Sequence, residues 1–193
     1  RDFFQCGKCE LVQVPSIFHL SRTDAKSRYM EHNNEVGDIG YRRFLSRLSG
    51  EILPHLIVPG NGLDYGAGPG PALAEIFREN GHKIDLYDPY FHPDRSVLAR
   101  FYDFVVCSET AEHFVNPKTD FDQIYNLLVP GGMLGIMTSV YYDSIHFPDW
   151  YYINDPTHVS FYSPETMGWI ATHWNWEFWT PTENVYLFRK PDL

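Results

Sequence analysis

The sequence is poor in the features that mark several classes of protein. Only 3 of its 193 residues are cysteines, too few for a disulfide framework, so a reducing cytoplasm is the expected location. It contains no block rich in lysine or arginine, and its net charge is −10. Because contacts with phosphates need clustered cations, nucleic acid is disfavoured as a substrate. No apolar run approaches the roughly 20 residues that cross a bilayer, so no membrane partner is expected.

The composition favours a folded domain. Hydrophobic residues make up 44% and aromatic residues 17% of the chain, which excludes disorder. The length suits one domain with a sizeable core and room for a small appendage. No signal peptide is visible, and because the chain begins at Arg1 rather than at methionine, we expect it to be a piece of a longer chain.

A glycine-rich stretch at residues 62–70, Gly-Leu-Asp-Tyr-Gly-Ala-Gly-Pro-Gly, organises the chain. The apolar residues 56–58 precede it, and residues 72–78 have helical apolar spacing. This pattern predicts the end of a buried strand, a tight turn and the start of a helix. Glycine lets a ligand approach the main chain closely, and the helix would point its free N–H groups at that ligand.

The details of this stretch favour a cationic ligand. The dinucleotide pattern G-x-G-x-x-G needs a glycine where the chain has Pro71, and proline has no N–H to offer to a phosphate. Asp64, at the strand end, would repel a pyrophosphate but suits an ammonium group. No Gly-Lys-Ser/Thr follows, which excludes a P-loop. The sequence therefore favours a nucleoside that carries an amino acid over NAD or ATP.

Two further strand ends carry polar residues. Residues 84–87 predict a buried strand that ends at Asp88, where a carboxylate can accept hydrogen bonds from both hydroxyls of a ribose. Residues 101–110 predict a fully buried strand that ends at Ser108 and Glu109. Ligands bind at the carboxyl edge of an open α/β sheet, so these side chains should face the ligand.

The remaining segments complete an alternating pattern of helices and strands. Residues 21–56 predict two helical pieces, and residues 111–128 predict another helix. A Pro-Gly-Gly turn at 130–132 leads into a further strand. Residues 176–179 and 185–188 predict a terminal antiparallel hairpin.

Residues 139–164 form a long connection at the predicted ligand-binding edge of the sheet. It is rich in aromatic side chains, which is typical of a binding pocket or a lid. His158 is the candidate general base, because the unperturbed pKa of histidine lies near working pH. The alternative is a histidine that only bonds the loop backbone. Ser163 and Pro164 predict the start of a helix.

The motifs, in this order, resemble the class I S-adenosylmethionine-dependent methyltransferases. Residues 63–70 resemble their first motif, residues 88–90 their second, and Leu-x-Pro-Gly-Gly at 128–132 a later element. The resemblance covers about residues 40–190 and is to the small-molecule branch. It implies a three-layer, Rossmann-like α/β fold. The sheet would be mostly parallel, with a C-terminal antiparallel hairpin.

The chain departs from this family in one region. Thirteen residues separate Asp88 from Tyr102, too few for the usual helix plus third strand. We therefore expect a shortened third-strand region. The acidic residue that commonly binds the adenine amino group there has no clear counterpart, because Asp94 belongs to a predicted turn.

The resemblance implies a role for each motif. Asp64 and the glycine loop would hold the amino-acid end of the cofactor, Asp88 its ribose and Tyr90 its adenine. Tyr41 or Arg42 would reach the methionine carboxylate, the alternative being a packing helix with solvated arginines. The residues expected to bind S-adenosylmethionine are Tyr41, Asp64, Gly66, Ala67, Gly68, Asp88, Pro89, Tyr90, Ser108 and Glu109.

Methyl transfer to an unidentified small-molecule acceptor, through oxygen or nitrogen, is the expected function. Glu109 would lie near the reacting groups, and His158 would remove the acceptor's proton. His113 is expected to be a structural histidine near the cleft wall, the alternative being a residue that orients the substrate or caps the site. The alternative is an S-adenosylmethionine-binding module that has lost catalysis and acts through a partner. An NAD-dependent oxidoreductase is disfavoured by Asp64 and Pro71.

Residues 1–20 are expected to form a short segment ahead of a methyltransferase domain at residues 21–193, which begins with a helical cover. Cys6 and Cys9 have the spacing of half a tetrahedral zinc site. Three interpretations stay open: a β-turn with unligated cysteines, the second knuckle of an N-terminal zinc ribbon that some relatives carry, and, least favoured, a redox pair. No metal site is assigned within this chain.

Overall fold

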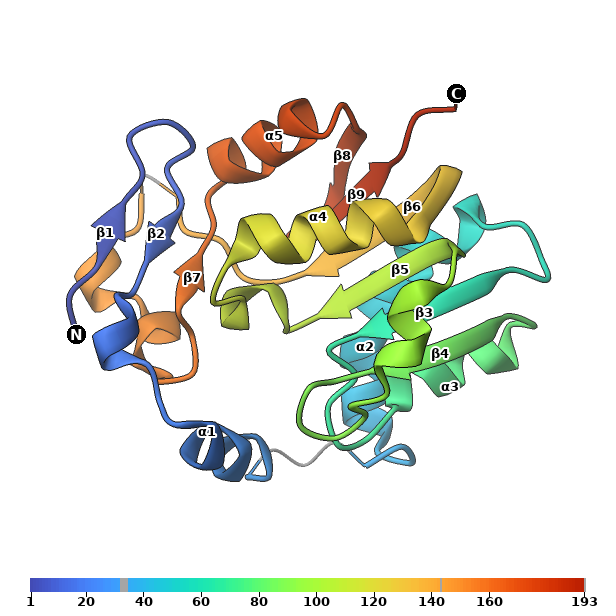
Figure 1. Cartoon of the computed structure of the whole chain (residues 1–193), viewed down its shortest axis with the longest axis horizontal. Coiled ribbons are helices and arrows are strands. Elements are labelled where there is room, and N and C mark those ends of the chain that lie inside the picture. Colours follow the sequence, from blue (N-terminus) through green and yellow to red (C-terminus); the bar gives the residue numbers. More distant parts are fainter. Residues whose placement is uncertain (32–34, 143, 193) are drawn as a thin grey trace.

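A six-stranded sheet forms the centre of the computed structural model, which describes residues 1–31, 35–142 and 144–192 (Figure 1). In spatial order the strands are β4 (Lys83–Tyr87), β3 (Asn61–Tyr65), β5 (Tyr102–Ser108), β6 (Leu128–Met137), β9 (Val185–Arg189) and β8 (Glu177–Thr182). The first four are parallel, and β9 pairs antiparallel with both β6 and β8. The predicted mostly parallel sheet with a C-terminal antiparallel hairpin is confirmed.

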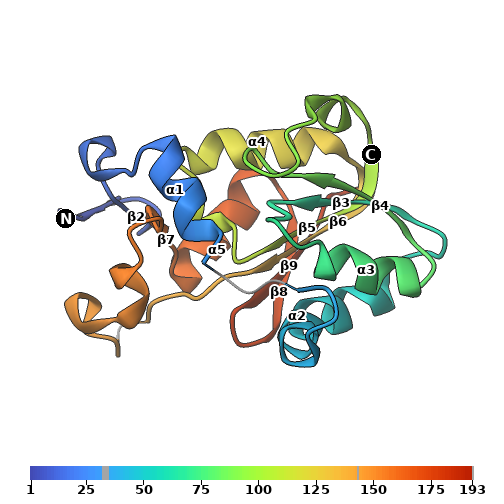
Figure 2. The same cartoon turned by 90° about the horizontal axis from the view of Figure 1, so that it is seen from below.

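Helices cover both faces of this sheet, which gives the three predicted layers (Figure 2). On one face lie α2 (Ile39–Ile52) and α3 (Ala72–Glu79), and on the other α4 (Pro117–Leu127) and α5 (Pro164–His173). In the central strand β5, Phe104, Val105, Val106 and Cys107 are fully buried. A parallel strand covered on both faces is a continuous apolar run, as the sequence indicates.

The helix starts follow from local side chains. The Asp38 carboxylate accepts a hydrogen bond of 2.6 Å from the N–H of Tyr41 and caps α2. Ser163 and Thr166 form a capping box at the start of α5. Among the described residues, no helix has both the length and the apolar character of a membrane span.

Two predicted element boundaries are wrong. Residues 56–58 were expected to belong to the strand before the glycine loop, but β3 begins at Asn61 and Ile57 is 86% exposed. Pro59 lacks the N–H that a ladder needs, so the strand begins after it. The helix expected over 111–128 is a 3₁₀ turn, Ala111–His113, followed by α4, which starts at Pro117. Proline fits the first turn of a helix and not its interior.

The third-strand region is shortened, as predicted. Between β4 and β5 the chain forms one 3₁₀ helix, Arg95–Ala99, and no strand. The Asp94 carboxylate accepts from the N–H of Ser96 and caps that helix, so Asp94 does belong to a turn. β4 is therefore an edge strand of the sheet.

The N-terminal segment pairs with the long aromatic connection in a second, small sheet. Its strands are β1 (Phe4–Gln5), β2 (Val12–Gln13) and β7 (Ser160–Phe161). The Arg1 guanidinium donates to the carbonyl oxygens of Asp155 (2.9 Å), Pro156 (3.1 Å) and His158 (2.9 Å). The start of the chain thus holds the loop that carries His158.

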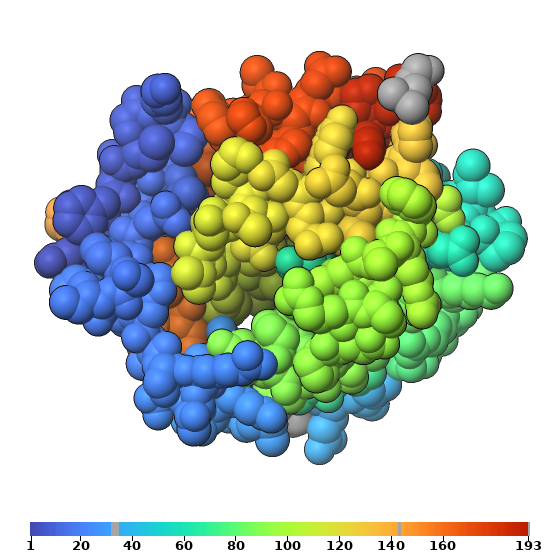
Figure 3. Space-filling model, viewed as in Figure 1, coloured from blue at the N-terminus to red at the C-terminus, as the bar shows by residue number. Residues whose placement is uncertain are grey.

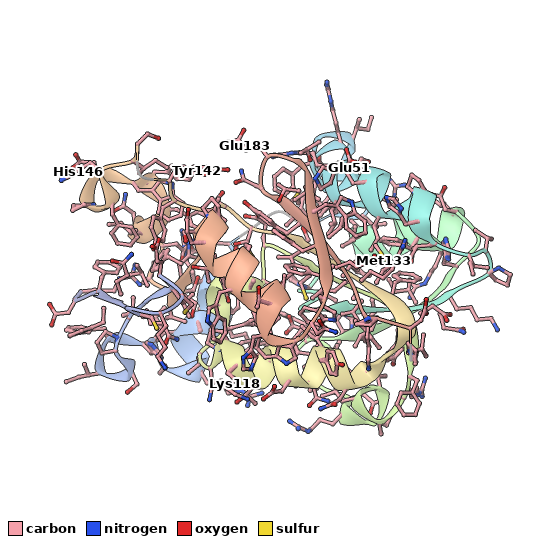
Figure 4. All side chains as sticks on the ribbon, turned by 90° about the horizontal axis from the view of Figure 1, so that it is seen from above. Glu51, Lys118, Met133, Tyr142, His146 and Glu183 are labelled. Atoms are coloured by element: carbon pink, nitrogen blue, oxygen red, sulfur yellow. The ribbon has the colours of Figure 1, made fainter. Side chains whose placement is uncertain are left out.

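The aromatic connection begins beside the tip of the C-terminal hairpin, where the N–H of Thr138 donates to the carbonyl oxygen of Asn184 across 3.1 Å. Figure 4 shows His146 at the far end of the connection and Glu183 at the tip of the hairpin, near Glu51 of α2. The Arg47 guanidinium of α2 donates to the carbonyl oxygen of Glu183 across 2.8 Å, which fixes the hairpin tip on that helix.

Candidate functional site

A cleft of about 940 Å³ opens where β3, β4 and β5 end. Its other walls are helix α1 (Arg22–Tyr29) and residues 151–158 of the aromatic connection. Figure 3 shows the hollow between the N-terminal part of the chain and the sheet. The predicted site residues that line the cleft are Tyr41, Gly66, Ala67, Gly68, Asp88, Pro89, Tyr90, Ser108, Glu109 and His158.

The glycine loop is shaped for close contact and offers few free donors. Gly66 has φ +92°, and a Cβ there would lie 2.1 Å from Cγ2 of Thr110. The N–H groups of Gly66 and Ala67 donate to the carbonyl oxygen of Tyr87 at 2.8 and 3.1 Å. These N–H groups are therefore bonded within the chain, and the loop admits a ligand by its lack of side chains.

The Asp88 carboxylate joins the end of β4 to this loop. Oδ1 accepts from the N–H groups of Tyr90 (2.7 Å) and Phe91 (3.0 Å), and Oδ2 accepts from the N–H of Gly68 (3.1 Å). A carboxylate has about four acceptor positions, so one is left for a ligand hydroxyl. Accepting from both hydroxyls of a ribose, as the sequence suggests, requires one of these bonds to be released.

Asp64 lies beneath the cleft and does not line it. It is 3% exposed, and burial, followed by the negative charge of Asp88, raises its pKa to about 7. Burial, with the charges of Asp64 and Glu109, also raises the pKa of Tyr41 to about 12. Arg42, the alternative partner for a methionine carboxylate, forms an ion pair with Glu79 of α3 and does not line the cleft.

Helix α1 covers the β4 end of the cleft. The ring of Tyr29 packs edge-on against Tyr90, with centroids 5.3 Å apart, and against His113 at 5.1 Å. The Arg22 guanidinium lies over the ring of Tyr90, 5.4 Å from its centroid. Tyr90 is thus held between helix α1 and the Asp88 turn.

The end of β5 presents one unsatisfied hydroxyl and one perturbed carboxyl group. Ser108 Oγ is buried and has no hydrogen-bond partner among the described residues. Burial and, secondly, the charge of Glu112 raise the pKa of Glu109 to about 9, so this carboxyl group is neutral at pH 7. Buried polar atoms without a partner are exceptional in folded proteins, and Ser108 is a lining residue of the cleft.

Beside Glu109 lies a hydrogen-bonded group centred on Glu112, a residue that the sequence analysis did not single out. Glu112 is 1% exposed and accepts from Thr138 Oγ1 (2.8 Å) and from the Tyr152 hydroxyl (2.5 Å). Nδ1 of His158 lies 2.8 Å from the carbonyl oxygen of Tyr152. A carbonyl only accepts, so His158 donates from Nδ1 and its lone pair is on Nε2. Burial lowers the pKa of His158, which favours the neutral ring.

The neighbouring histidine is also part of the cleft. His113 lines it, and Nδ1 of His113 lies 3.0 Å from the carbonyl oxygen of Thr157. His113 therefore contacts the loop backbone, as expected of a structural histidine, and its ring also faces the cleft. Asp120 of α4 is a further lining residue that the sequence did not single out. Burial raises its pKa to about 6, and it accepts from the Tyr65 hydroxyl across 2.9 Å.

Cys6 and Cys9 lie in the turn between β1 and β2 and do not line the cleft. Cys6 is exposed and Cys9 is half-buried. Among the described residues, neither belongs to a group of three or more side chains that could hold a metal ion. The half-site therefore remains incomplete within this part of the chain, and the comparisons below lend no support to a zinc ribbon.

A sequence model of the methyltransferase domain family matches residues 32–180. Among solved structures, the Burkholderia thailandensis 1,6-didemethyltoxoflavin-N1-methyltransferase, with bound 1,6-didemethyltoxoflavin and S-adenosylhomocysteine, is 16% identical with a TM-score of 0.63; the alignment covers 94% of this chain and 95% of that one. A candidate sarcosine dimethylglycine methyltransferase from Galdieria sulphuraria is 18% identical (TM-score 0.60, 81% and 76% covered).

A third solved structure, the [4+2]-cyclase SpnF, is 11% identical with a TM-score of 0.53 and coverage of 79% and 82%. No curated protein sequence matches this chain. At these identities the structural likeness shows the fold, which several reactions share.

Proposed function

Because this chain belongs to the methyltransferase domain family, we propose that it binds S-adenosylmethionine in the cleft and transfers a methyl group to a small-molecule oxygen or nitrogen acceptor. The observation that carries the proposal is the convergence of the glycine loop, Asp88 and the end of β5 on one cleft. Ligands of open α/β sheets bind at this edge.

The residues of the cleft fit this cofactor. Its volume of about 940 Å³ lies near the upper end of the roughly 300–1,000 Å³ of small-molecule sites, which leaves room for an acceptor beside the cofactor. The unpaired Ser108 Oγ would gain a partner. Asp64, which is buried beneath the cleft, would act on the cofactor's ammonium group through its charge and not as a lining residue. Tyr41, Gly66, Ala67, Gly68, Pro89, Tyr90 and Glu109 would complete the binding site.

When bound, the cofactor supplies a methyl group on a cationic sulfur, which a lone pair of the acceptor displaces directly. The enzyme therefore needs to orient the acceptor and exclude water. Helix α1 and residues 151–158 enclose the cleft and would do both. The Nε2 lone pair of His158 is the group proposed to take the acceptor's proton, and Glu109 would lie beside the reacting atoms.

A small-molecule acceptor is favoured by two observations. The net charge of −10 disfavours a phosphate-rich polymer, and the structure of the similar Burkholderia enzyme contains bound 1,6-didemethyltoxoflavin. The aromatic rings of Tyr151 and Tyr152 in the cleft wall suit a flat ring system in the acceptor. No comparison supports a module without catalysis. A cytoplasmic location stays a prediction from the cysteine content.

Calorimetric titration with S-adenosylmethionine and S-adenosylhomocysteine tests the proposal. We expect micromolar binding by the wild type and at least about tenfold weaker binding by Asp88→Asn, since a charge-assisted hydrogen bond contributes roughly 1.5–3 kcal/mol. Asp94→Asn, which changes an exposed cap outside the cleft, is the matched control. Absence of binding by the folded wild type rejects the proposal. Binding then justifies a screen of acceptors with methyl-labelled cofactor.

A further inference from the structure

Three side chains in the cleft wall lie close enough to hold one ion. One ligand atom each from Glu112, His113 and His158 lies within 4.8 Å of those of the other two, and in the described part of the chain this is the one such group of three or more. The two histidine rings have centroids 5.0 Å apart. Two of the ligands follow β5 directly, and the third comes from the aromatic connection.

The backbone fixes the same nitrogen lone pair on both histidines. Nδ1 of His113 lies 3.0 Å from the carbonyl oxygen of Thr157, and Nδ1 of His158 lies 2.8 Å from that of Tyr152. Both rings must donate from Nδ1, which leaves Nε2 as the ligating nitrogen in each neutral ring. Histidines that bind metals almost always donate their other N–H to a carbonyl or carboxylate in this way.

The carboxylate is oriented but not neutralised. Glu112 accepts from Thr138 Oγ1 and from the Tyr152 hydroxyl, which uses two of its roughly four acceptor positions. It is 1% exposed, and none of the ion pairs formed by the described residues includes it. Buried carboxylates are ordinarily paired with a cation or bound to a metal ion. Glu112 keeps about two acceptor positions with which it could bind one.

We propose that Glu112, His113 and His158 bind a divalent transition-metal ion such as Zn²⁺. Two histidines and one carboxylate form a common ligand set of catalytic zinc and non-haem metal sites, which keep a further position open. Because all three residues line the cleft, the open position faces the space assigned to the acceptor. The inference rests on the proposed function in this respect: the ion would hold the acceptor's oxygen or nitrogen.

A bound cation changes how the acceptor loses its proton. A divalent ion lowers the pKa of an oxygen bound to it, so an acceptor hydroxyl would release its proton to solvent. The oxygen lone pair then forms the bond to the methyl carbon as the carbon–sulfur bond breaks and its electron pair stays on sulfur. In this arrangement His158 acts as a ligand, and its Nε2 lone pair is not available as a base.

Metal binding by the chelator-stripped protein tests the site directly. The double variant Cys6→Ser/Cys9→Ser serves as the parent, so that the thiols cannot bind the ion. We expect one Zn²⁺ per chain by calorimetry, and a visible Co²⁺ spectrum without thiolate bands. Glu112→Gln, His113→Gln and His158→Gln should each weaken binding by at least about 10–100-fold, the loss found even for outer partners of metal ligands.

His146→Gln is the matched control, because His146 is exposed, pairs with Asp149 and does not line the cleft. No bound ion, or binding that the three variants leave unchanged, overturns the proposal. If a variant does not fold, the melting temperature of the parent decides: a rise with Zn²⁺ supports the site, and no rise rejects it. Binding of S-adenosylhomocysteine without metal binding rejects the metal site alone. Absence of both rejects the proposed function as well.

Turnover separates the two roles of His158. If His158 is a base, a chelator has no effect on turnover, which counts against the metal site. If both histidines are ligands, either substitution and the chelator abolish activity, and Zn²⁺ restores the chelated parent.

Discussion

The N–H of Gly68 donates to Oδ2 of Asp88 across 3.1 Å, so a side chain at the end of β4 holds the loop at the end of β3. Oδ1 of the same carboxylate accepts from the N–H groups of Tyr90 and Phe91. The wall of the cleft assigned to the cofactor is therefore one hydrogen-bonded unit before any ligand arrives. Such preorganisation reduces the cost of ordering the loop on binding.

Replacing this carboxylate should loosen the loop in the free protein. In Asp88→Asn the N–H of Gly68 meets either a neutral amide oxygen or an NH2 group that cannot accept. The weaker bond costs about 1 kcal/mol, which corresponds to roughly fivefold more frequent opening of the glycine loop. We expect faster hydrogen exchange at the amides of residues 66–70, measured by mass spectrometry without cofactor. Asp94→Asn should leave exchange in this loop unchanged, and equal acceleration in both variants contradicts the prediction.

Gly66→Ala should destabilise the fold strongly. Its φ of +92° costs an L-residue roughly 1–2 kcal/mol, and the new Cβ would meet Thr110 at 2.1 Å. We expect a loss above about 2 kcal/mol, or a fall in melting temperature of at least about 4 °C for a domain of this size. Gly168→Ala is the control: it lies in α5 with nothing within 4 Å of the new Cβ and should stabilise by about 0.5–1 kcal/mol.

Asp64 should make cofactor affinity depend on pH. Its pKa is about 7 in the folded chain against an ordinary 3.8, so it is protonated below about pH 7, and a cationic ligand in the adjacent cleft should favour loss of that proton. Affinity should rise with pH up to about 7 and then level off. Calorimetry at pH 6 in buffers of different ionisation enthalpy should report proton release, which Asp64→Asn abolishes. An equal release by that variant would assign the proton to another group.

The same shift has a consequence for stability. Between about pH 4 and 7 the folded chain binds the Asp64 proton more tightly than the unfolded chain does, so this group's contribution falls as pH rises through that window. The stability of Asp64→Asn relative to wild type should therefore increase from pH 4 to 7 in chemical denaturation. A difference that does not change with pH rejects the assigned pKa.

Substitution of His158 should act on turnover and leave cofactor binding intact. Whether His158 takes the acceptor's proton itself or binds an ion that promotes its release, loss of this help with proton transfer should lower the rate by about 100- to 10,000-fold. The glycine loop and Asp88 are held by other bonds. We expect His158→Ala to bind S-adenosylhomocysteine within about twofold of wild type, while turnover with an acceptor from the screen collapses. Unchanged turnover removes His158 from the chemistry.

The sequence predicts the sheet because its signals are local. The buried strands are continuous apolar runs, and the glycine loop and Pro-Gly-Gly turn punctuate them. It misplaces the start of β3 because Ile57 and Val58 are apolar yet exposed. Surface apolar residues are common in folded proteins, so hydrophobicity alone could not separate this run from a strand.

The site is predicted less completely because its chemistry depends on distant partners. Glu112 is oriented by hydrogen bonds from Thr138 and Tyr152, which lie 26 and 40 positions later in the chain. No local sequence pattern shows that these atoms meet. Arg42 illustrates the converse, since its helix was placed correctly but its side chain reaches Glu79 on α3. The signal that was available for Glu112 is its place directly after a predicted buried strand, beside His113.

The pairing of Val12 with Phe161 joins positions 149 residues apart (161 − 12 = 149), whereas Gly68 and Asp88 are 20 apart. Distant pairs pay a larger loop-closure entropy and form later. During synthesis, the wall assigned to the cofactor can assemble while the chain is still growing. The wall that carries His158 must wait until residue 161 has left the ribosome, so the wall assigned to the acceptor forms after the wall assigned to the cofactor.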